Sequence, residues 1–240
     1  MRPTSAHPLP QPTAARGGDM RAQLLVAATR LFAERGFDGT ALQDIADAVG
    51  IRKPSLLHHF ASKDDLRLAV LDDLLSRWKD ILPALLMAAT NAGRRFDAVF
   101  ETVVAFFVED PARARLLVRE VLDRPAAMKT LIREHLRPWL GMIADYIRQG
   151  QREGIIHADV DADAYIAQML HFIMASIAMQ DTLGVVLTRG ESPRAGMERA
   201  TRELTRLARA ALFLPRTPTR GRSRSRSAAA RTLDRTPTFR

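Results

Sequence analysis

The fold is decided by residues 40–66, TALQDIADAVGIRKPSLLHHFASKDDL. Their apolar side chains recur at helical spacing in two short runs, which predicts two helices that each bury one face. Gly50 separates the two runs, and glycine adopts a positive φ without steric cost, so it predicts a tight turn between them. The stretch therefore predicts a helical hairpin, followed at Ser62 by the start of a third helix.

The starts of these helices carry recognisable signals. Thr40 is expected to cap the first helix, with Gln43 three residues later completing a capping box. Pro54 falls in the first turn of the second helix, where proline is tolerated because first-turn amides have no intrahelical acceptor. Ser62 is expected to cap the third helix together with Asp65. These signals predict where each of the three helices begins.

Two short helices joined by a glycine turn have the geometry of a helix-turn-helix, whose second helix enters the major groove of DNA. Short polar or basic side chains at the start of that helix suit base edges, and flanking polar groups suit phosphates. An ordinary packed helical hairpin without a role in nucleic-acid binding is the alternative, because such hairpins are common in helical proteins. The predicted DNA contacts are Thr40, Arg52, Lys53, Pro54, Ser55, Leu57, His58, His59 and Lys63.

Residues 19–78 resemble the N-terminal domain of the tetracycline-repressor (TetR) family of regulators. The resemblance is carried, in the same order, by RAQLLVAATRLFAERGFDGT, QDIADAVGI, KPSLLHHF and SKDDL. It implies a dimeric DNA-binding regulator with a C-terminal helical domain that binds a small molecule. It also implies which of the predicted DNA contacts face bases, namely Lys53, Pro54, Ser55 and Leu57, and which hold phosphates, namely Thr40, His59 and Lys63.

The chain departs from the family pattern at two of these positions. Leu57 stands where the family usually has tyrosine, so a contact with a thymine methyl group is kept but a hydroxyl contact is lost. Arg52 stands where a small capping residue such as serine is common, which weakens the cap and adds a basic side chain. Operator preferences therefore do not transfer from a relative to this chain.

Composition excludes several classes of protein. The 240 residues are 47% hydrophobic, which suits a globular chain, and the absence of cysteine excludes disulfides and thiolate metal sites. The net charge of +9 lies mainly in the two ends, since 215–240 hold eight arginines and one aspartate, and 1–18 hold two arginines and no acid. The start of the chain has no apolar core of a signal peptide, and no apolar run is long enough to span a bilayer. A bacterial cytoplasmic protein that associates with the nucleoid and not with a membrane is expected.

Beyond residue 60 the pattern stays helical, without a convincing strand or internal repeat, so the expected fold is all-α. The expected organisation is a disordered tail over 1–17, a DNA-binding domain over 18–78 with its motif at about 41–60, a helical ligand-binding and dimerisation domain over 79–214, and a disordered arginine-rich tail over 215–240. Outside the hairpin, helices are expected over residues 19–35, 95–109, 111–122, 161–187 and 193–214. Two more long helices are expected to start at residues 63 and 125, with kinks at Pro83 and Pro138 respectively.

The resemblance assigns dimerisation to the last two long helices and ligand binding to the same domain. A four-helix contact between two copies would cover their apolar stripes, although the same residues could pack within one chain. The predicted dimer residues are Ile166, Leu170, Ile173, Ile177, Leu204, Leu207, Ala208 and Ala211. The predicted pocket, which suits a hydrophobic ligand but could equally be plain core, comprises Phe106, Phe107, Leu117, His135, Trp139, Met142, Met169 and Phe172.

The leading hypothesis is a homodimeric transcription factor, most often a repressor in this family, that binds a pseudo-palindromic DNA operator and responds to a small effector. A ligand-dependent activator or a co-repressed regulator fits the same residues. An enzyme is disfavoured because no catalytic motif is present, and no cofactor or metal is expected, since His157 and Asp159 alone do not make a site. A nucleic-acid-binding protein that acts through its basic tail is the remaining alternative.

Overall fold

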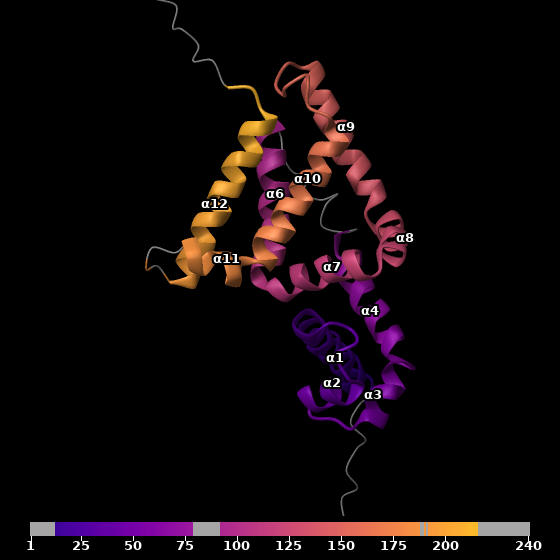
Figure 1. Ribbon diagram of the computed structural model, residues 1–240. Helices are drawn as coiled ribbons and strands as arrows, with labels where there is room; N and C mark the ends of the chain where they lie inside the picture. The colour runs from indigo at the N-terminus through magenta and orange to yellow at the C-terminus, as the bar shows by residue number, and fades with distance from the viewer. Residues whose placement is uncertain (1–12, 79–91, 188–189, 191, 216–240) are drawn as a thin grey trace, which may run out of the picture.

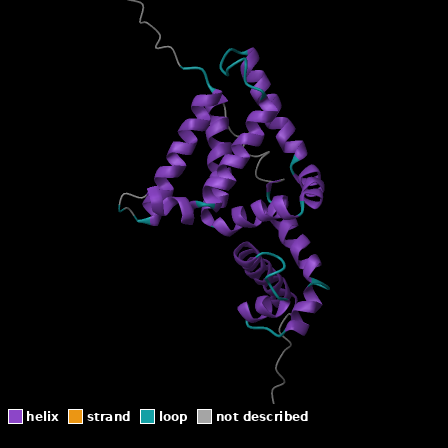
Figure 2. Ribbon diagram, viewed as in Figure 1, coloured by secondary structure: helices purple, strands orange, loops and turns teal. Residues whose placement is uncertain are grey.

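The computed structural model describes residues 13–78, 92–187, 190 and 192–215, and this part of the chain forms eleven α-helices and no strand (Figure 2). The expected all-α fold is confirmed. The helices are α1 (Thr13–Arg35), α2 (Leu42–Ala48), α3 (Lys53–His59), α4 (Lys63–Ser76), α6 (Ala92–Glu109), α7 (Pro111–Asp123), α8 (Pro125–His135), α9 (Arg137–Arg152), α10 (Ala162–Ala178), α11 (Gln180–Leu187) and α12 (Pro193–Leu212).

Helices α1–α4 form a small unit at one end of the molecule (Figure 1). Its core is built from side chains that are almost completely buried, including Leu24, Phe32, Ile45, Leu56 and Leu66. They come from all four helices, so the hairpin α2–α3 shares one core with α1 and α4. Hydrophobic burial therefore fixes the direction in which α3 points.

The N-terminal helix starts earlier than the sequence indicated. Helix α1 begins at Thr13, so residues 13–17 are helical and not part of a disordered tail. Alanine and arginine, which fill Ala14–Arg16, are strong helix formers, and this local preference prevails over the Pro- and Gly-rich composition around them. The other predicted tail segments, residues 1–12 and 216–240, and the predicted kink at Pro83 lie outside the described residues.

The C-terminal domain is organised around α7, against which α6, α8 and α10 pack. Helices α6 and α10 rise from one side of α7, with α12 packed beside them, whereas α1 lies against the other side of α7 (Figure 1). Helix α9 runs alongside α10, and α8 connects α7 to α9 and touches α4. Helix α7 is thus a wall shared by the two domains. Among the described residues, no helix has the length and apolarity that crossing a membrane requires.

Two helices predicted as continuous are each split in two. The helix that starts at Pro125 stops at Leu136, and α9 starts at Arg137 with Pro138 in its first turn. A proline ring clashes with the carbonyl four residues earlier and has no N–H to donate, so the predicted kink is a full break. The predicted helix 161–187 is interrupted at Met179, where Arg115 of α7 donates from Nε to the carbonyl oxygen of Ala178 at 3.4 Å.

The end of α9 and the end of α12 are joined. After Gly154, which turns the chain at φ +66°, Ile156 forms an isolated antiparallel bridge with Phe213. Ile156 is fully buried against Gly150, where a β-carbon would lie 2.6 Å from the Ile156 Cδ1 atom. Only glycine at position 150 leaves room for this contact, which closes the top of the domain.

Candidate nucleic-acid interface and effector cavity

The turn between α2 and α3 has the geometry that the sequence predicted. Gly50 adopts φ +73°, and the Ile51 amide donates to the Ala46 carbonyl oxygen at 3.0 Å. Ala46 and Leu56 are fully buried, so both helices are anchored on either side of the turn. The outer face of α3 is therefore held rigidly toward solvent.

The start of α3 presents the predicted base-contacting side chains. Arg52 is the N-cap by backbone position, without a side-chain capping hydrogen bond, and Lys53, Pro54 and Ser55 follow it on the exposed surface. Leu57 is 39% exposed, which leaves its methyl groups accessible. His58 is also exposed and His59 is half-buried, which completes the list of predicted contacts on this helix.

Thr40 has a different role from the one predicted. The N-cap of α2 is Ala41, whose amide donates to the Asp44 carboxylate at 3.1 Å, and Gln43 takes no part in the cap. Thr40 is only 1% exposed, and its hydroxyl donates to the Gly36 carbonyl oxygen at 2.8 Å. The hydroxyl satisfies the end of α1 and is not available to a phosphate, so the capping prediction is wrong and the side chain is removed from the predicted contacts.

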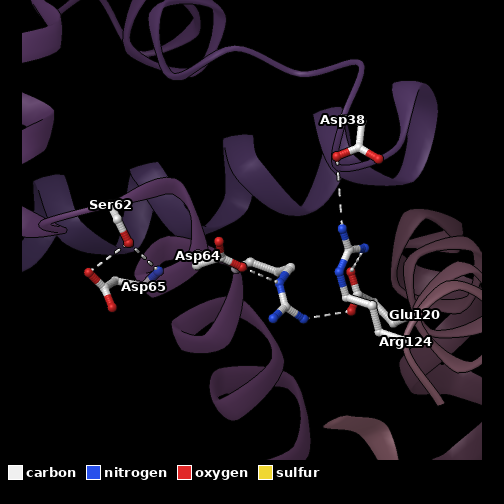
Figure 3. Close-up of polar contacts among 7 residues, drawn as sticks. Asp38, Ser62, Asp64, Asp65, Glu120 and Arg124 are labelled. Carbon is white, nitrogen blue, oxygen red and sulfur yellow. Dashed lines mark hydrogen bonds and ion pairs between the residues drawn. The ribbon is translucent and has the colours of Figure 1, made fainter. Parts of the chain in front are cut away.

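The start of α4 follows the prediction closely. The Ser62 hydroxyl oxygen accepts from the Asp65 amide at 3.0 Å and its hydrogen goes to the Asp65 carboxylate at 2.8 Å (Figure 3). Lys63, a predicted phosphate contact, is half-buried with its Nζ 4.2 Å from the centre of the Phe37 ring. The ammonium group and the ring form a cation–π contact of modest strength, which holds the Lys63 side chain in place.

A buried ion pair that the sequence analysis missed joins the two domains. The Arg67 guanidinium of α4 lies 2.8 Å from the Glu120 carboxylate of α7, and their side chains are 8% and 3% exposed. Arg124 reaches the other Glu120 oxygen at 3.7 Å and extends toward Asp38, which follows α1 (Figure 3). Asp64 completes the network at 3.3 Å from Arg67 Nε. The network fixes α4 and the end of α1 to the shared wall α7.

A second polar contact lies beside this network. His135, buried at the end of α8, has its Nε2 atom 3.2 Å from the Asp72 carboxylate of α4. Its Nδ1 atom is buried without a hydrogen-bond partner among the described residues. Two α4 side chains are thus tied to the C-terminal domain, one through α7 and one through α8.

The C-terminal domain contains an apolar cavity that holds about 650 Å³ of space not filled by atoms, its open mouth included. Helices α6, α9 and α10 supply most of the wall. The lining residues are Arg95, Phe96, Val99, Phe100, Val103, Leu140, Ile143, Tyr146, Ile147, Tyr165, Ile166, Met169, Leu170, Ile173 and Leu212.

Comparisons with known proteins agree with this architecture. Residues 24–70 match the model of bacterial regulatory proteins of the tetR family, and residues 94–206 match that of the tetracyclin repressor-like C-terminal domain. The HTH-type transcriptional repressor KstR2 of Mycobacterium tuberculosis is 33% identical over 149 residues, which cover 60% of this chain and 72% of that protein. The chain belongs to the TetR family.

Other TetR-family proteins share parts of the sequence or the fold. The HTH-type transcriptional activator FasR of Mycolicibacterium smegmatis is 34% identical over 99 residues, covering 41% of this chain and 45% of that protein. The structure of the ketosteroid transcriptional regulator KstR2 of Mycobacterium tuberculosis superposes with a TM-score of 0.62 at 24% identity, over 82% of this chain and 96% of that one. A TetR regulator from Chloroflexus aurantiacus gives 0.59 at 23% identity, over 84% and 100%. The chain is therefore a DNA-binding transcription regulator and not an enzyme.

The cavity of this TetR-family protein differs from the predicted pocket, with which it shares only Met169. Met142 and Phe172 are exposed, the latter by 53%, so neither lies in a core. Phe106 is buried but stacks edge-on against Trp78, with ring centres 4.7 Å apart. The other predicted pocket residues, which the cavity does not include, are Phe107 and Leu117, both buried, His135, paired with Asp72, and Trp139, partly buried.

Most of the predicted dimer residues pack inside the chain. Ile166, Ile173, Ile177, Leu204 and Ala208 are buried in one copy, and Leu170 lines the cavity. The alternative of packing within one chain therefore accounts for them, because α10 touches α6, α7, α9 and α12 and has more than one buried face. Of the predicted set, Leu207 and Ala211 are exposed.

Proposed function

We propose that the chain is a homodimeric repressor that binds a pseudo-palindromic operator through α3 and leaves it when a small apolar ligand fills the cavity. The observation that carries the DNA-binding part is the exposed start of α3, where Arg52, Lys53 and Ser55 project from a helix anchored by buried Leu56. Basic and hydroxyl side chains at this position suit guanine edges and phosphates. Leu57 adds an accessible apolar group for a thymine methyl.

Dimerisation is proposed through the outer faces of α10 and α12. Phe172 of α10, Met179 directly after α10 and Leu207 of α12 are each about half exposed, which leaves large apolar groups in water beside both helices. Pairing the two helices with those of a second copy would cover these groups in a four-helix contact. One α3 reads few bases, so two copies on two half-sites supply the specificity that an operator requires.

The ligand is proposed to act through α7. Helix α10, which lines the cavity, packs on α7, and α7 packs on α1 and holds α4 through Glu120. A ligand shifts the equilibrium only if it binds the DNA-free form more tightly than the DNA-bound form. Displacement of α10 against α7 is a route by which filling the cavity would change the spacing of two α3 helices.

Relatives of this chain differ in the sign of their regulation. KstR2 is named as a repressor and FasR as an activator, and the chain resembles both. A ligand-dependent activator or a co-repressed regulator would use the same residues. We favour repression, because KstR2, which matches the larger part of the chain, is named as a repressor, and we propose the bacterial nucleoid as the place of action.

Fluorescence anisotropy of the full chain on duplexes that tile its own upstream region, at physiological salt, tests the proposal. One tile should bind tightly, and Lys53→Ala/Ser55→Ala should lose that binding, whereas Lys129→Ala, an exposed lysine on α8, should keep it. The proposal would be contradicted if every tile bound in a salt-sensitive way and the double variant kept that binding. Deleting residues 216–240 would then show whether the arginine-rich tail carries the interaction.

A further inference from the structure

The cations of the DNA-binding domain divide into those that are paired with a carboxylate and those that are not. Four arginines of residues 19–78 each lie within 3.5 Å of a carboxylate oxygen, namely Arg30, Arg35, Arg67 and Arg77. The remaining arginines and lysines of this range have no carboxylate partner among the described residues, and they are Arg21, Arg52, Lys53 and Lys63. Three of these four are proposed DNA contacts on other grounds. Arg21 of α1 is the fourth, and nothing so far accounts for it.

The Arg21 side chain lies beside the end of α3. The central carbon of its guanidinium is 5.0 Å from the centre of the Phe60 ring, and Phe60 is the residue at which α3 ends. Phe60 is buried in the core of the domain, whereas Arg21 is exposed. The guanidinium is therefore held against a fixed ring, at the surface, next to the helix that is proposed to read the DNA.

An aromatic ring leaves more of the arginine available than a carboxylate would. The ring attracts the guanidinium through its quadrupole but carries no net charge, so the positive charge of Arg21 is not neutralised. The ring also provides no oxygen acceptor, so N–H donors of the guanidinium remain free for a ligand. Because the contact already restricts the side chain, less conformational entropy is lost when a ligand binds.

Lys63, a proposed phosphate contact, is held in the same way. Its Nζ atom lies 4.2 Å from the centre of the Phe37 ring, and it too lacks a carboxylate partner among the described residues. Lys63 opens α4 only three residues after Phe60, and α1 packs against α4. Arg21 and Lys63 are thus two unpaired cations, each placed on an aromatic ring, close to the end of α3.

We propose that Arg21 binds a phosphate of the DNA backbone beside the end of α3. The seven residues of α3 span about 10 Å along the helix axis, and the major groove is about 12 Å wide. A cation just beyond the end of a helix in the groove therefore lies near the phosphates that flank it. A guanidinium with free N–H donors suits phosphate oxygens. The inference rests on the proposed function, in which α3 enters the groove.

Fluorescence anisotropy of the full chain on the preferred tile and on an unrelated duplex of equal length, over about 50–200 mM salt, tests the inference. A phosphate contact does not depend on base sequence, so Arg21→Gln should weaken the binding of both duplexes. The loss should be about five- to twentyfold for a dimer that makes the contact twice. The slope of log affinity against log salt should become shallower by about one for each Arg21 that contacts the duplex. Arg21→Lys keeps the charge and should keep the slope.

Arg30→Gln is the matched control, because Arg30 is an exposed arginine of the same helix that is paired with Glu34. It should bind both duplexes as wild type does. The inference would be overturned by a wild-type slope in Arg21→Gln, by an equal loss of affinity in Arg30→Gln, or by a slope that falls as much in Arg21→Lys as in Arg21→Gln. If wild type prefers no tile, the proposed function fails, but the effect of Arg21→Gln on the unrelated duplex still decides this inference.

Discussion

The strongest test of how the two domains are joined is removal of one charge from the Arg67–Glu120 pair. Glu120→Gln keeps the shape of the side chain but leaves the Arg67 guanidinium, 8% exposed, without its buried counterion. Breaking a buried pair in this way costs about 3–5 kcal/mol. Asp64 still lies 3.3 Å from Arg67 but is well exposed, and such a contact returns about 1 kcal/mol at most. We expect the free energy of unfolding to fall by about 3 kcal/mol.

The assay is urea unfolding followed by far-UV circular dichroism, at one fixed protein concentration because dimerisation would shift the midpoint. Arg67→Met/Glu120→Leu removes both charges and should recover most of the loss, since well-packed apolar replacements of buried pairs are often neutral. Arg77→Met breaks the exposed pair with Asp73 on the same helix and should cost about 1 kcal/mol or less. A Glu120→Gln midpoint equal to that of Arg77→Met, or a double variant no more stable than Glu120→Gln, would refute the reasoning.

Three further changes test the remaining parts of the structure. Gly150→Ala would place a β-carbon 2.6 Å from Ile156 Cδ1 and should cost about 1–3 kcal/mol in thermal or urea unfolding, with Ile156→Val restoring part of it. Leu57→Tyr should leave stability unchanged because the side chain is exposed, but should change which operator tile binds most tightly in anisotropy. Burial raises the pKa of Tyr146 from 10 to about 12, so stability should fall as pH rises through this window, and Tyr146→Phe should make the decline shallower in pH-dependent unfolding.

Local signals in the sequence were enough to predict the hairpin. Gly50, Pro54 and Ser62 each act within a few residues, and each has the predicted role. The predicted Thr40 cap was wrong because α2 begins one residue later, with Ala41 as its N-cap, and Thr40 is buried with its hydroxyl donating to the Gly36 carbonyl oxygen. The place of the Thr40 side chain depends on how α1 ends, which a capping pattern read along α2 does not include.

The lining of the cavity could not be predicted, and the dimer face stays a prediction, because α10 is apolar on several sides. A periodic stripe such as Ile166, Ile173 and Ile177 identifies a buried face, but it does not say whether the cover comes from the same chain or a second copy. The face that α10 leaves exposed carries Phe172, which the sequence analysis had placed in the pocket. To tell which face of α10 is covered by which partner requires the positions of α6, α7, α9 and α12, and local sequence patterns do not contain this information.

The Arg67–Glu120 pair shows why the contact between the two domains could not be predicted from the sequence either. The two residues are 53 positions apart, and neither belongs to a motif. This ion pair nevertheless couples the two domains in the proposed switch. Helix α7, which carries Glu120, contacts the cavity-lining α10 on one side and α1 on the other. A ligand that displaces α10 would also act on α7, to which α4 is fixed by a buried ion pair. Small shifts of α7 would then be passed to α4 and α3 as a rigid movement, since a packed interior and a buried ion pair do not deform gradually.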